Sequence, residues 1–364
     1  MTTPSRAATA PSTGDRSTRT LSSGSLPPRG GGNDGASAFS ETLRRVLGVA
    51  AAAFAFLVTV QAMAQGLPAG VKTFSAKDVI EGTKVSREQC AKLPKAVFVE
   101  AFGDGICVRY YLHGSAKGRA AVVFFTGDVL GLSKTGQREV EPGYLTQAPE
   151  FIDIASRVWG ERLGTPVIYF GRMGMTGSSG WHGDRRTALE AEVTKKALDA
   201  IKAREGAIGF HLAGQSGGAM LVPALVAARD DIGCAVIASG PLDFRRFTAA
   251  YGISFRTVGK RAHLDPMAQV PQVAARTAGA DPTRLFLLTD PADTAVPAKF
   301  QTPWVGAIEA AGGHVTQILT GGRGVEHHAL IEKSLFVARD CIAGKSDAAI
   351  EKVWKGRGGD DLPR

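Results

Sequence analysis

The chain has 364 residues, of which 44% are hydrophobic and 21% are charged, and its formal net charge is +9 at pH 7. This composition excludes a wholly disordered chain and provides apolar material for one large core or two small ones. The Lys and Arg residues are scattered rather than gathered in a basic run, which favours a solvated basic surface over a nucleic-acid site.

The start of the chain is expected to lie outside the folded domain. Residues 1–40 are rich in Ser, Thr, Gly, Pro and Ala and contain almost no large apolar side chains. Such a segment cannot bury enough apolar surface to offset the entropy of ordering it, so we expect a disordered N-terminal extension.

Residues 41–64 have the pattern of a secretory signal peptide. Two arginines precede an uncharged apolar run over 46–60, and a small-residue A-x-A pattern ends at Ala64. Cleavage after Ala64 would leave residues 65–364 as an exported domain, periplasmic or secreted, with no membrane contact. The alternative is an uncleaved membrane anchor, although about 15 apolar residues fall short of the roughly 20 in a spanning helix.

All four cysteines lie after the predicted cleavage site. Cys90 and Cys107 flank an expected strand and could close a short loop, whereas a disulfide between Cys234 and Cys341 is only one possibility. None of the four has a neighbouring His or second Cys at metal-ligand spacing, so we expect neither a metal site nor a cofactor.

After Gln65 the sequence alternates between expected strands and expected helices. The expected strands are Lys95–Ala101, Ile106–Leu112, Ala120–Phe125, Pro166–Phe170, Ile208–Ala213, Cys234–Ala238, Arg284–Thr289 and Val315–Leu319. The expected helices are Phe151–Leu163, Thr187–Arg204, Ala219–Ala228, Pro297–Ala311 and Ala329–Ala343, the last of which closes the chain. Repeated β-α units predict an α/β protein with a mostly parallel sheet and helices on both faces. Residues 240–283 are not assigned, and within them 240–265 could form a small lid insertion.

The most informative motif is Gly-Gln-Ser-Gly-Gly at 214–218. It fits the G-x-S-x-G pattern and lies between an expected strand and an expected helix. A serine on a sharp strand-to-helix turn exposes its Oγ, and small flanking residues let the backbone turn that tightly. Ser216 is therefore predicted to be a nucleophile. The alternative is a glycine-rich turn with an incidental serine.

A nucleophilic serine needs a base and an acid that orients the base. In folds whose serine lies on such a strand-to-helix turn, here called the elbow, the three residues follow in the order serine, acid, histidine. The strand that ends at Thr289 leads into Asp290-Pro-Ala-Asp293. We favour Asp293 as the acid because its Asp-x-x-Val-Pro context begins the next helix. Asp290 is the competitor, and either aspartate can instead be a turn residue or an N-cap.

The base is expected in the loop after the last strand. Glycines over 321–324 allow this loop to fold back over the serine, and it ends in His327-His328. Consecutive residues point in different directions, so one histidine is expected to face the serine while the other packs or caps. We favour His328, because Leu330 two residues later would pack inward, but His327 is nearly as suitable.

An oxyanion hole requires two backbone N–H donors near the serine. The residue after the nucleophile, Gly217, supplies the first. The loop after the strand Ala120–Phe125, which reads Thr126-Gly127-Asp128, is expected to supply the second from the N–H of Asp128.

In the order of these motifs the chain resembles the α/β-hydrolase family. The resemblance spans roughly residues 95–343 and rests on the elbow, the Asp-x-x-Val-Pro at 293–297, the late His-His-Ala-Leu and the strand-Gly loop at 122–127. It implies an eight-stranded, mostly parallel sheet and an acyl-enzyme mechanism. The segment Gly171–Gly180 is similar to the family's Arg-x-Gly-x-x-Gly-x-Ser stretch, which borders the site, and it either shapes the pocket or is only a tight loop.

The chain departs from the family's pattern at two positions. Thr126 stands where many members have the His of a His-Gly pair, and Asp290 stands where many have a Gly before the acid. Both departures leave the predicted triad intact.

These motifs predict an exported serine hydrolase that acts on a small-molecule carboxylic ester. The alternatives are a serine peptidase that resembles the catalytic domain of prolyl oligopeptidases, with a peptide substrate, and a hydrolase fold that binds without catalysis. The identity of the substrate and the oligomeric state are left open, because fold alone does not determine them.

Overall fold

The computed structural model describes residues 71–132, 137–257 and 261–363. The predicted extension, residues 1–40, and the predicted signal peptide, residues 41–64, lie outside the described residues. Within the described part, no helix combines the length and the apolar character needed to cross a membrane.

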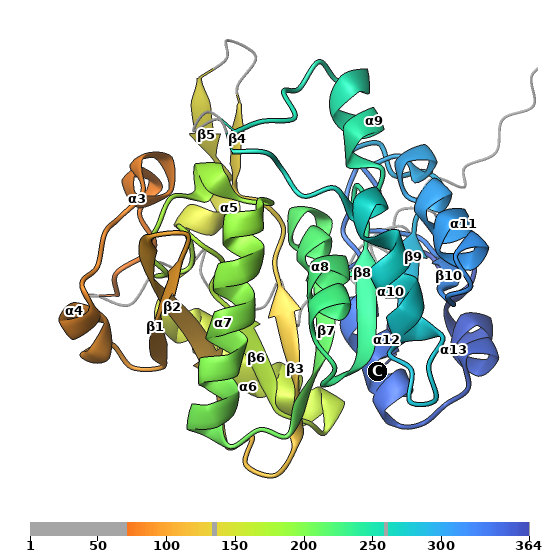
Figure 1. Cartoon of the computed structure of the whole chain (residues 1–364), viewed down its shortest axis with the longest axis horizontal. Helices are drawn as coiled ribbons and strands as arrows, with labels where there is room; N and C mark the ends of the chain where they lie inside the picture. Colours follow the sequence, from red (N-terminus) through yellow and green to blue (C-terminus); the bar gives the residue numbers. More distant parts are fainter. Residues whose placement is uncertain (1–70, 133–136, 258–260, 364) are drawn as a thin grey trace, which may run out of the picture. The chain divides into compact units, whose positions relative to one another are not determined.

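An eight-stranded sheet forms the centre of the fold, in the order β1-β2-β6-β3-β7-β8-β9-β10 (Figure 1). β2 runs antiparallel to both of its neighbours, and every other pair in this sheet is parallel. The strands are β1 (Ala96–Ala101), β2 (Asp104–Leu112), β3 (Ala120–Phe125), β6 (Val167–Phe170), β7 (Gly209–Gln215), β8 (Ile232–Ala238), β9 (Arg284–Thr289) and β10 (Thr316–Leu319). All eight predicted strands are confirmed, and the protein has the α/β-hydrolase fold.

Helices cover both faces of the sheet, and each face has its own apolar core. The first core packs the sheet against α7 (Ala188–Glu205), α8 (Leu221–Ala228), α10 (Val270–Thr277) and α11 (Thr302–Ala310). The second packs the opposite face against α6 (Pro149–Leu163), α12 (Ile331–Ile342) and α13 (Asp347–Trp354). Because both faces are covered, the central strands carry continuous apolar runs: in β3 only the first residue is not fully buried.

Several shorter elements lie outside the main sheet and its covering helices. They are the helices α3 (Ala76–Glu81), α4 (Arg87–Ala91), α5 (Pro142–Leu145) and α9 (Phe244–Ala250), the hairpin of β4 (Leu130–Leu132) and β5 (Arg138–Val140), and the short 3-10 helices η2 (His182–Asp184), η3 (Ser216–Met220), η4 (Pro266–Gln269) and η5 (Ala298–Phe300). Figure 1 shows α9 beyond the carboxyl end of β8, in the segment where the sequence predicts a lid.

Three helix predictions need correction. The helix predicted over Ala219–Ala228 begins later, because η3 forms the first turn after the strand. The helix predicted over Pro297–Ala311 is divided into η5 and α11, and Pro303, which lacks an amide hydrogen, lies in the first turn of α11. The helix at Ala329–Ala343 does not close the chain, because Ser346 caps the N-terminus of the further helix α13.

Two disulfides tie helices to the sheet. Cys90 of α4 is bonded to Cys107 of β2, and Cys234 of β8 is bonded to Cys341 of α12, with Cα–Cα distances of 5.6 and 6.3 Å. The second disulfide closes a loop of 107 residues, so in the chain-entropy account it removes more freedom from the unfolded chain than the first.

The register of the sheet brings the predicted site residues to one edge. Phe125, the last residue of β3, pairs with Gly214 of β7, and Leu319 of β10 pairs with Thr289 of β9. Since these strands are parallel, the loops that follow them leave the sheet from the same edge. Those loops carry Asp128, Ser216, the two aspartates and the two histidines.

Candidate active site

Ser216 lies on a strained turn between β7 and η3. Its φ is 54°, which is in the left-handed region that residues with a side chain rarely adopt. The turn is crowded: a Cβ on Gly217 would lie 2.2 Å from Asp128 Oδ1, and one on Gly218 would lie 2.2 Å from the carbonyl oxygen of Thr126. Only glycine fits at either position, which explains the small residues around the serine.

The loop after β3 lies directly against this turn. A Cβ placed on Gly127 would be 3.3 Å from the Cβ of Ser216, so the loop backbone passes beside the serine. Among the residues that the structure describes, none accepts a hydrogen bond from the backbone N–H of Gly217 or of Asp128. Two unengaged amide donors beside a serine are what an oxyanion hole requires.

Asp293 and His328 form a close pair at the same edge. His328 Nδ1 lies 2.9 Å from Asp293 Oδ2, and because a carboxylate only accepts hydrogen bonds, Nδ1–H is the donor. Asp293 Oδ1 accepts from the backbone N–H groups of Ala295 and Val296, at 2.9 and 2.8 Å. Asp293 therefore acts as a turn residue with one oxygen and orients the imidazole with the other. The tautomer set by this bond leaves His328 Nε2 free to accept a proton.

Gln215, the residue before the serine, ties the histidine loop to the elbow. Its buried side-chain amide donates to the carbonyl of His328 at 2.9 Å and accepts from the N–H of Leu330 at 3.0 Å. These two bonds bracket Ala329 and fix the backbone on both sides of it. The position of the loop is thus set by the elbow itself, and Leu330 packs inward as predicted.

The second predicted aspartate and histidine form a separate pair. His327 Nδ1 lies 3.3 Å from Asp290 Oδ2, and the His327 side chain is 52% exposed, against 21% for His328. Asp290 also accepts hydrogen bonds from the N–H groups of Gly322 and Ala292, at 2.6 and 2.8 Å. Both residues line a surface pocket of about 610 Å³, whose lining also includes six glycines. This pair therefore closes the loop on its outer side.

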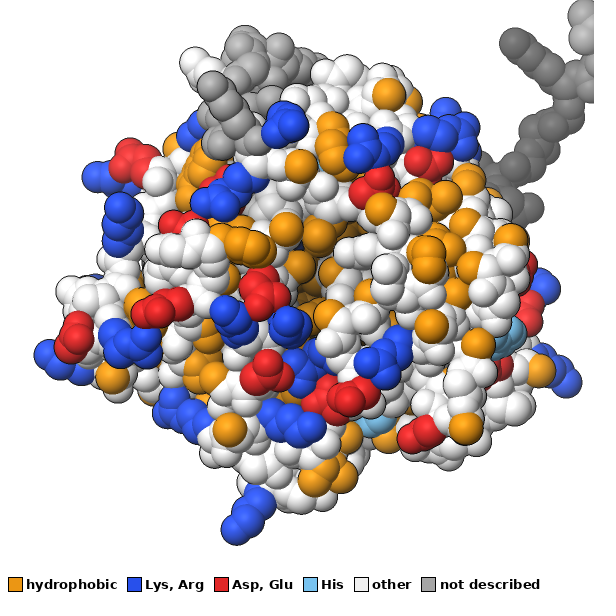
Figure 2. Space-filling view, in the orientation of Figure 1, with side chains coloured by type: hydrophobic (Ala, Val, Ile, Leu, Met, Phe, Trp, Pro, Cys, Tyr) orange, Lys and Arg blue, Asp and Glu red, His pale blue; other side chains and the backbone are white. Residues whose placement is uncertain are grey.

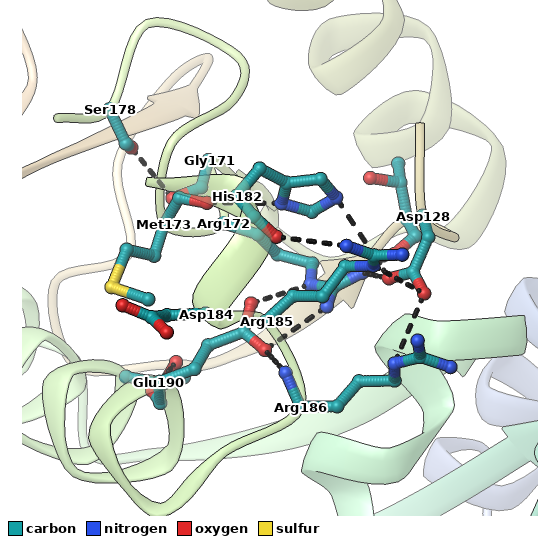
Figure 3. Close-up of polar contacts among 12 residues, drawn as sticks. Asp128, Gly171, Arg172, Met173, Ser178, His182, Asp184, Arg185, Arg186 and Glu190 are labelled. Atoms are coloured by element: carbon teal, nitrogen blue, oxygen red, sulfur yellow. Dashed lines mark hydrogen bonds and ion pairs between the residues drawn. The ribbon is translucent and has the colours of Figure 1, made fainter. Parts of the chain in front are cut away.

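Arg172 fixes the loop that carries Asp128 (Figure 3). Its fully buried guanidinium donates to the carbonyl of Thr126 at 3.0 Å and to Asp128 Oδ1 at 2.8 Å, while its Nε and Nη2 bind both carboxylate oxygens of Glu190. The neighbouring carboxylates raise the pKa of Arg172 despite the opposing effect of burial. The segment Gly171–Gly180 is therefore a tight turn that also holds the candidate oxyanion loop in place.

Asp128 is surrounded by positive charge. Burial alone would raise the pKa of this carboxyl, but Arg186, Arg185 and Arg172 hold it well below its usual range, so Asp128 is ionised at neutral pH. The nearby His182 is fully buried, and burial together with Arg172 lowers its pKa to about 3. His182 is therefore neutral, and its Nδ1 lies 3.1 Å from the carbonyl of Met173.

Two of these positioning residues, Gln215 and Arg172, were not predicted from the sequence. Gln215 lies inside the elbow motif, but a glutamine between a glycine and a serine gives no signal that its amide reaches a loop more than a hundred residues later. Arg172 lies in the segment Gly171–Gly180, yet its partners come from two other parts of the chain. No group of three or more metal-ligating side chains occurs among the residues described.

The face drawn in Figure 2 is hollowed near its centre, between the parts of the molecule that carry α7 and α10 in the same orientation. Hydrophobic side chains form the walls of the hollow, and Lys and Arg side chains gather beside it.

No protein-family model and no curated protein matches the sequence. Several solved structures are similar in fold. The esterase Pf2001 from Pyrococcus furiosus is 15% identical with a TM-score of 0.47, over 76% of this chain and 98% of its own. Est1E from Butyrivibrio proteoclasticus, with ferulic acid bound, is 12% identical with a TM-score of 0.46, over 69% and 99%.

A puromycin-hydrolysing peptidase from Mycobacterium tuberculosis is 16% identical with a TM-score of 0.47, over 69% of this chain and 39% of its own. Identities and TM-scores this low carry no argument about activity. The assignment of the fold rests instead on the order, direction and register of the eight strands.

Proposed function

We propose that this protein is an exported serine hydrolase that cleaves a carboxylic ester through an acyl-enzyme intermediate. The observation that carries the proposal is the Asp293–His328 pair, 2.9 Å apart, in a loop that Gln215 binds to the strained turn of Ser216. A serine with positive φ at the start of a short helix has no evident structural use.

In the proposed mechanism, Ser216 Oγ attacks the ester carbonyl carbon while His328 Nε2 takes the hydroxyl proton. Asp293 stabilises the imidazolium that forms and keeps the proton of Nδ1 in place. His328 then gives its proton to the leaving alcohol, and the acyl group remains on Ser216. A water molecule attacks the acyl-enzyme in the same way, which releases the carboxylic acid and restores the serine.

The backbone N–H groups of Gly217 and Asp128 are the proposed oxyanion hole. They would bind the negative oxygen of each tetrahedral intermediate, and removing one such donor typically costs about 10²–10³ in rate. Arg172 positions the Asp128 donor through the carbonyl of Thr126.

Export is part of the proposal. It rests on the signal-peptide pattern over residues 41–64, and the two disulfides of the structure support it, since disulfides persist mainly in oxidising compartments.

Covalent labelling tests the proposed chemistry. The mature chain and its Ser216→Ala variant would be treated with a neutral fluorophosphonate probe, and any adduct would be located by peptide mass spectrometry. The proposal predicts one adduct, on Ser216, and hydrolysis of p-nitrophenyl esters that the variant lacks. Cleavage of aminoacyl anilides in preference to esters would show a peptidase, and a folded protein that forms no adduct would show a hydrolase fold used for binding.

A further inference from the structure

The charges around Asp128 do not balance. The side chains of Arg172, Arg185 and Arg186 approach this carboxylate to 2.8, 3.0 and 3.3 Å (Figure 3). Among the described residues, Glu190 is the second carboxylate bound to this group, and His182 is neutral. Three guanidinium groups against two carboxylates leave an excess of one positive charge beside the elbow.

The excess charge falls on Arg186. Arg172 is held by Glu190 and Asp128, and Arg185 donates from its Nη atoms to the carbonyls of His182 and Leu130. No described residue accepts a hydrogen bond from either Nη atom of Arg186. Burial lowers the pKa of Arg186, and the adjacent arginines lower it further, against the opposing effect of Asp128. An anion placed at these Nη atoms would relieve the imbalance.

Arg186 is also held rigidly. Its φ is 58°, and its backbone is fixed at both ends, because its N–H donates to Glu190 and its carbonyl accepts from the N–H of Leu264. Its guanidinium lies 4.9 Å from the centre of the ring of Phe244, which is buried at the start of α9. A side chain fixed in this way loses little conformational entropy when it binds a ligand.

The location of Arg186 relates it to the proposed reaction centre. Asp128 contacts Arg186 through Oδ2, and the same carboxylate lies where a Cβ of Gly217 would be. A pocket of about 240 Å³ on the β4–β5 side of Asp128 is lined by Glu139 and Glu141, which disfavour an anion there. Arg186 does not line that pocket, so an anion bound to Arg186 would lie outside it.

We propose that Arg186 binds an anionic group of the substrate, a carboxylate, sulfonate or phosphate, so that the enzyme prefers esters that carry a negative charge. This inference rests on the serine hydrolase function proposed above and adds a substrate class to it. The guanidinium would donate charge-assisted hydrogen bonds from its two Nη atoms, and a planar fork of donors suits such oxyanions.

The test compares esters that differ in one charge. The first pair is mono-p-nitrophenyl glutarate and p-nitrophenyl valerate, which differ in the acyl group. The second pair is 4-acetoxybenzoate and its methyl ester, which differ in the leaving group. The measured quantity is the ratio of kcat/KM for the anionic ester to kcat/KM for the neutral ester, in the wild type and in Arg186→Gln, Arg186→Lys and Arg157→Gln.

The proposal predicts that the wild type prefers the anionic member of at least one pair. For that pair, Arg186→Gln should lower the ratio about 10- to 100-fold, since a charge-assisted hydrogen bond is lost. Arg186→Lys keeps the charge and should retain part of the preference. Arg157→Gln is the matched control on α6, at the opposite face of the sheet, and should leave the ratio unchanged.

The outcomes separate this inference from the function on which it rests. A neutral ester that is cleaved, with Ser216 labelled by the fluorophosphonate, and a ratio that Arg186→Gln does not change in either pair would overturn the anion site alone. No labelling and no ester cleavage would overturn the proposed function and this inference together.

Discussion

Two aspartate–histidine pairs lie side by side in sequence but differ in their surroundings. Asp293 and His328 are 2.9 Å apart in a loop that Gln215 binds to the elbow, and the His328 side chain is 21% exposed. Asp290 and His327 are 3.3 Å apart beside a surface pocket, and the His327 side chain is 52% exposed. The same two residue types thus have two different environments at one edge of the sheet.

The difference shows what distinguishes the pair that we propose to be catalytic. In both pairs the aspartate accepts hydrogen bonds from backbone N–H groups, so the turn geometry of the aspartate does not distinguish them. The pairs differ in what holds the backbone of the histidine in place. The His328 backbone is bound to the residue that precedes the serine, whereas Asp290 binds the N–H of Gly322 and so joins the histidine loop to the loop after β9.

Replacing each histidine should give the largest contrast. We expect His328→Ala to lower kcat by about 10⁵-fold or more, because the proposed base of the triad is lost. We expect His327→Ala to leave kcat almost unchanged, since its ring contacts Asp290 at the surface. Steady-state hydrolysis of a p-nitrophenyl ester would measure both, and similar losses in the two variants would contradict the assignment.

Replacing each aspartate should separate catalysis from stability. Asp293→Asn should lower kcat by about 10³–10⁴ because the amide favours the wrong imidazole tautomer. Asp290→Asn should keep activity but lower the free energy of unfolding by about 1–3 kcal/mol, because an amide nitrogen can face the N–H of Gly322. Ester hydrolysis and urea unfolding of both variants would check this. The opposite pattern would exchange the two roles.

Removing the hydrogen bonds between Gln215 and the histidine loop should make the Asp293–His328 pair less precisely positioned, like the Asp290–His327 pair. Gln215→Ala should lower kcat by about 10- to 100-fold with a smaller change in KM, because the imidazole loses its fixed position. Gln215→Glu keeps the acceptor for the N–H of Leu330 but sets a buried carboxylate oxygen against the His328 carbonyl, so its loss should be at least as large. Wild-type kcat in Gln215→Ala would show that this link does not position the base.

Three further histidines should make the stability of the fold depend on pH. Burial lowers the pKa of His211 and of His263 to about 4, and that of His182 to about 3. Between about pH 6.5 and 4 the unfolded chain therefore binds protons that the folded protein does not. The free energy of unfolding should fall as the pH is lowered through this window.

Urea unfolding at pH 7 and pH 5 would measure this fall in the free energy of unfolding, which is the smallest of the predicted effects. His211→Asn should reduce the dependence on pH, because one of the three neutral imidazoles is removed. An equal free energy of unfolding at the two pH values would contradict the proposed neutral state of these side chains.

The sequence predicted the framework of the fold well, because apolar runs and turn residues are local signals. All eight strands of the sheet follow from them, as does the turn at Ser216. The sequence favoured Asp293 and His328 but could not exclude Asp290 or His327. Each of the four residues follows the carboxyl end of a strand, where a catalytic residue is expected. Their sorting into two pairs depends on Gln215 and Gly322, whose contacts cross the fold. The cluster around Asp128 was not predicted for the same reason.

The most direct test of the account is the labelling of Ser216 in the two histidine variants. Wild type, His327→Ala and His328→Ala would be treated with the same neutral fluorophosphonate, and the rate and position of the adduct would be followed by mass spectrometry. The account predicts rapid labelling at Ser216 in the wild type and in His327→Ala, and almost none in His328→Ala. Labelling that depends on His327 rather than His328, or an adduct on another residue, would contradict it.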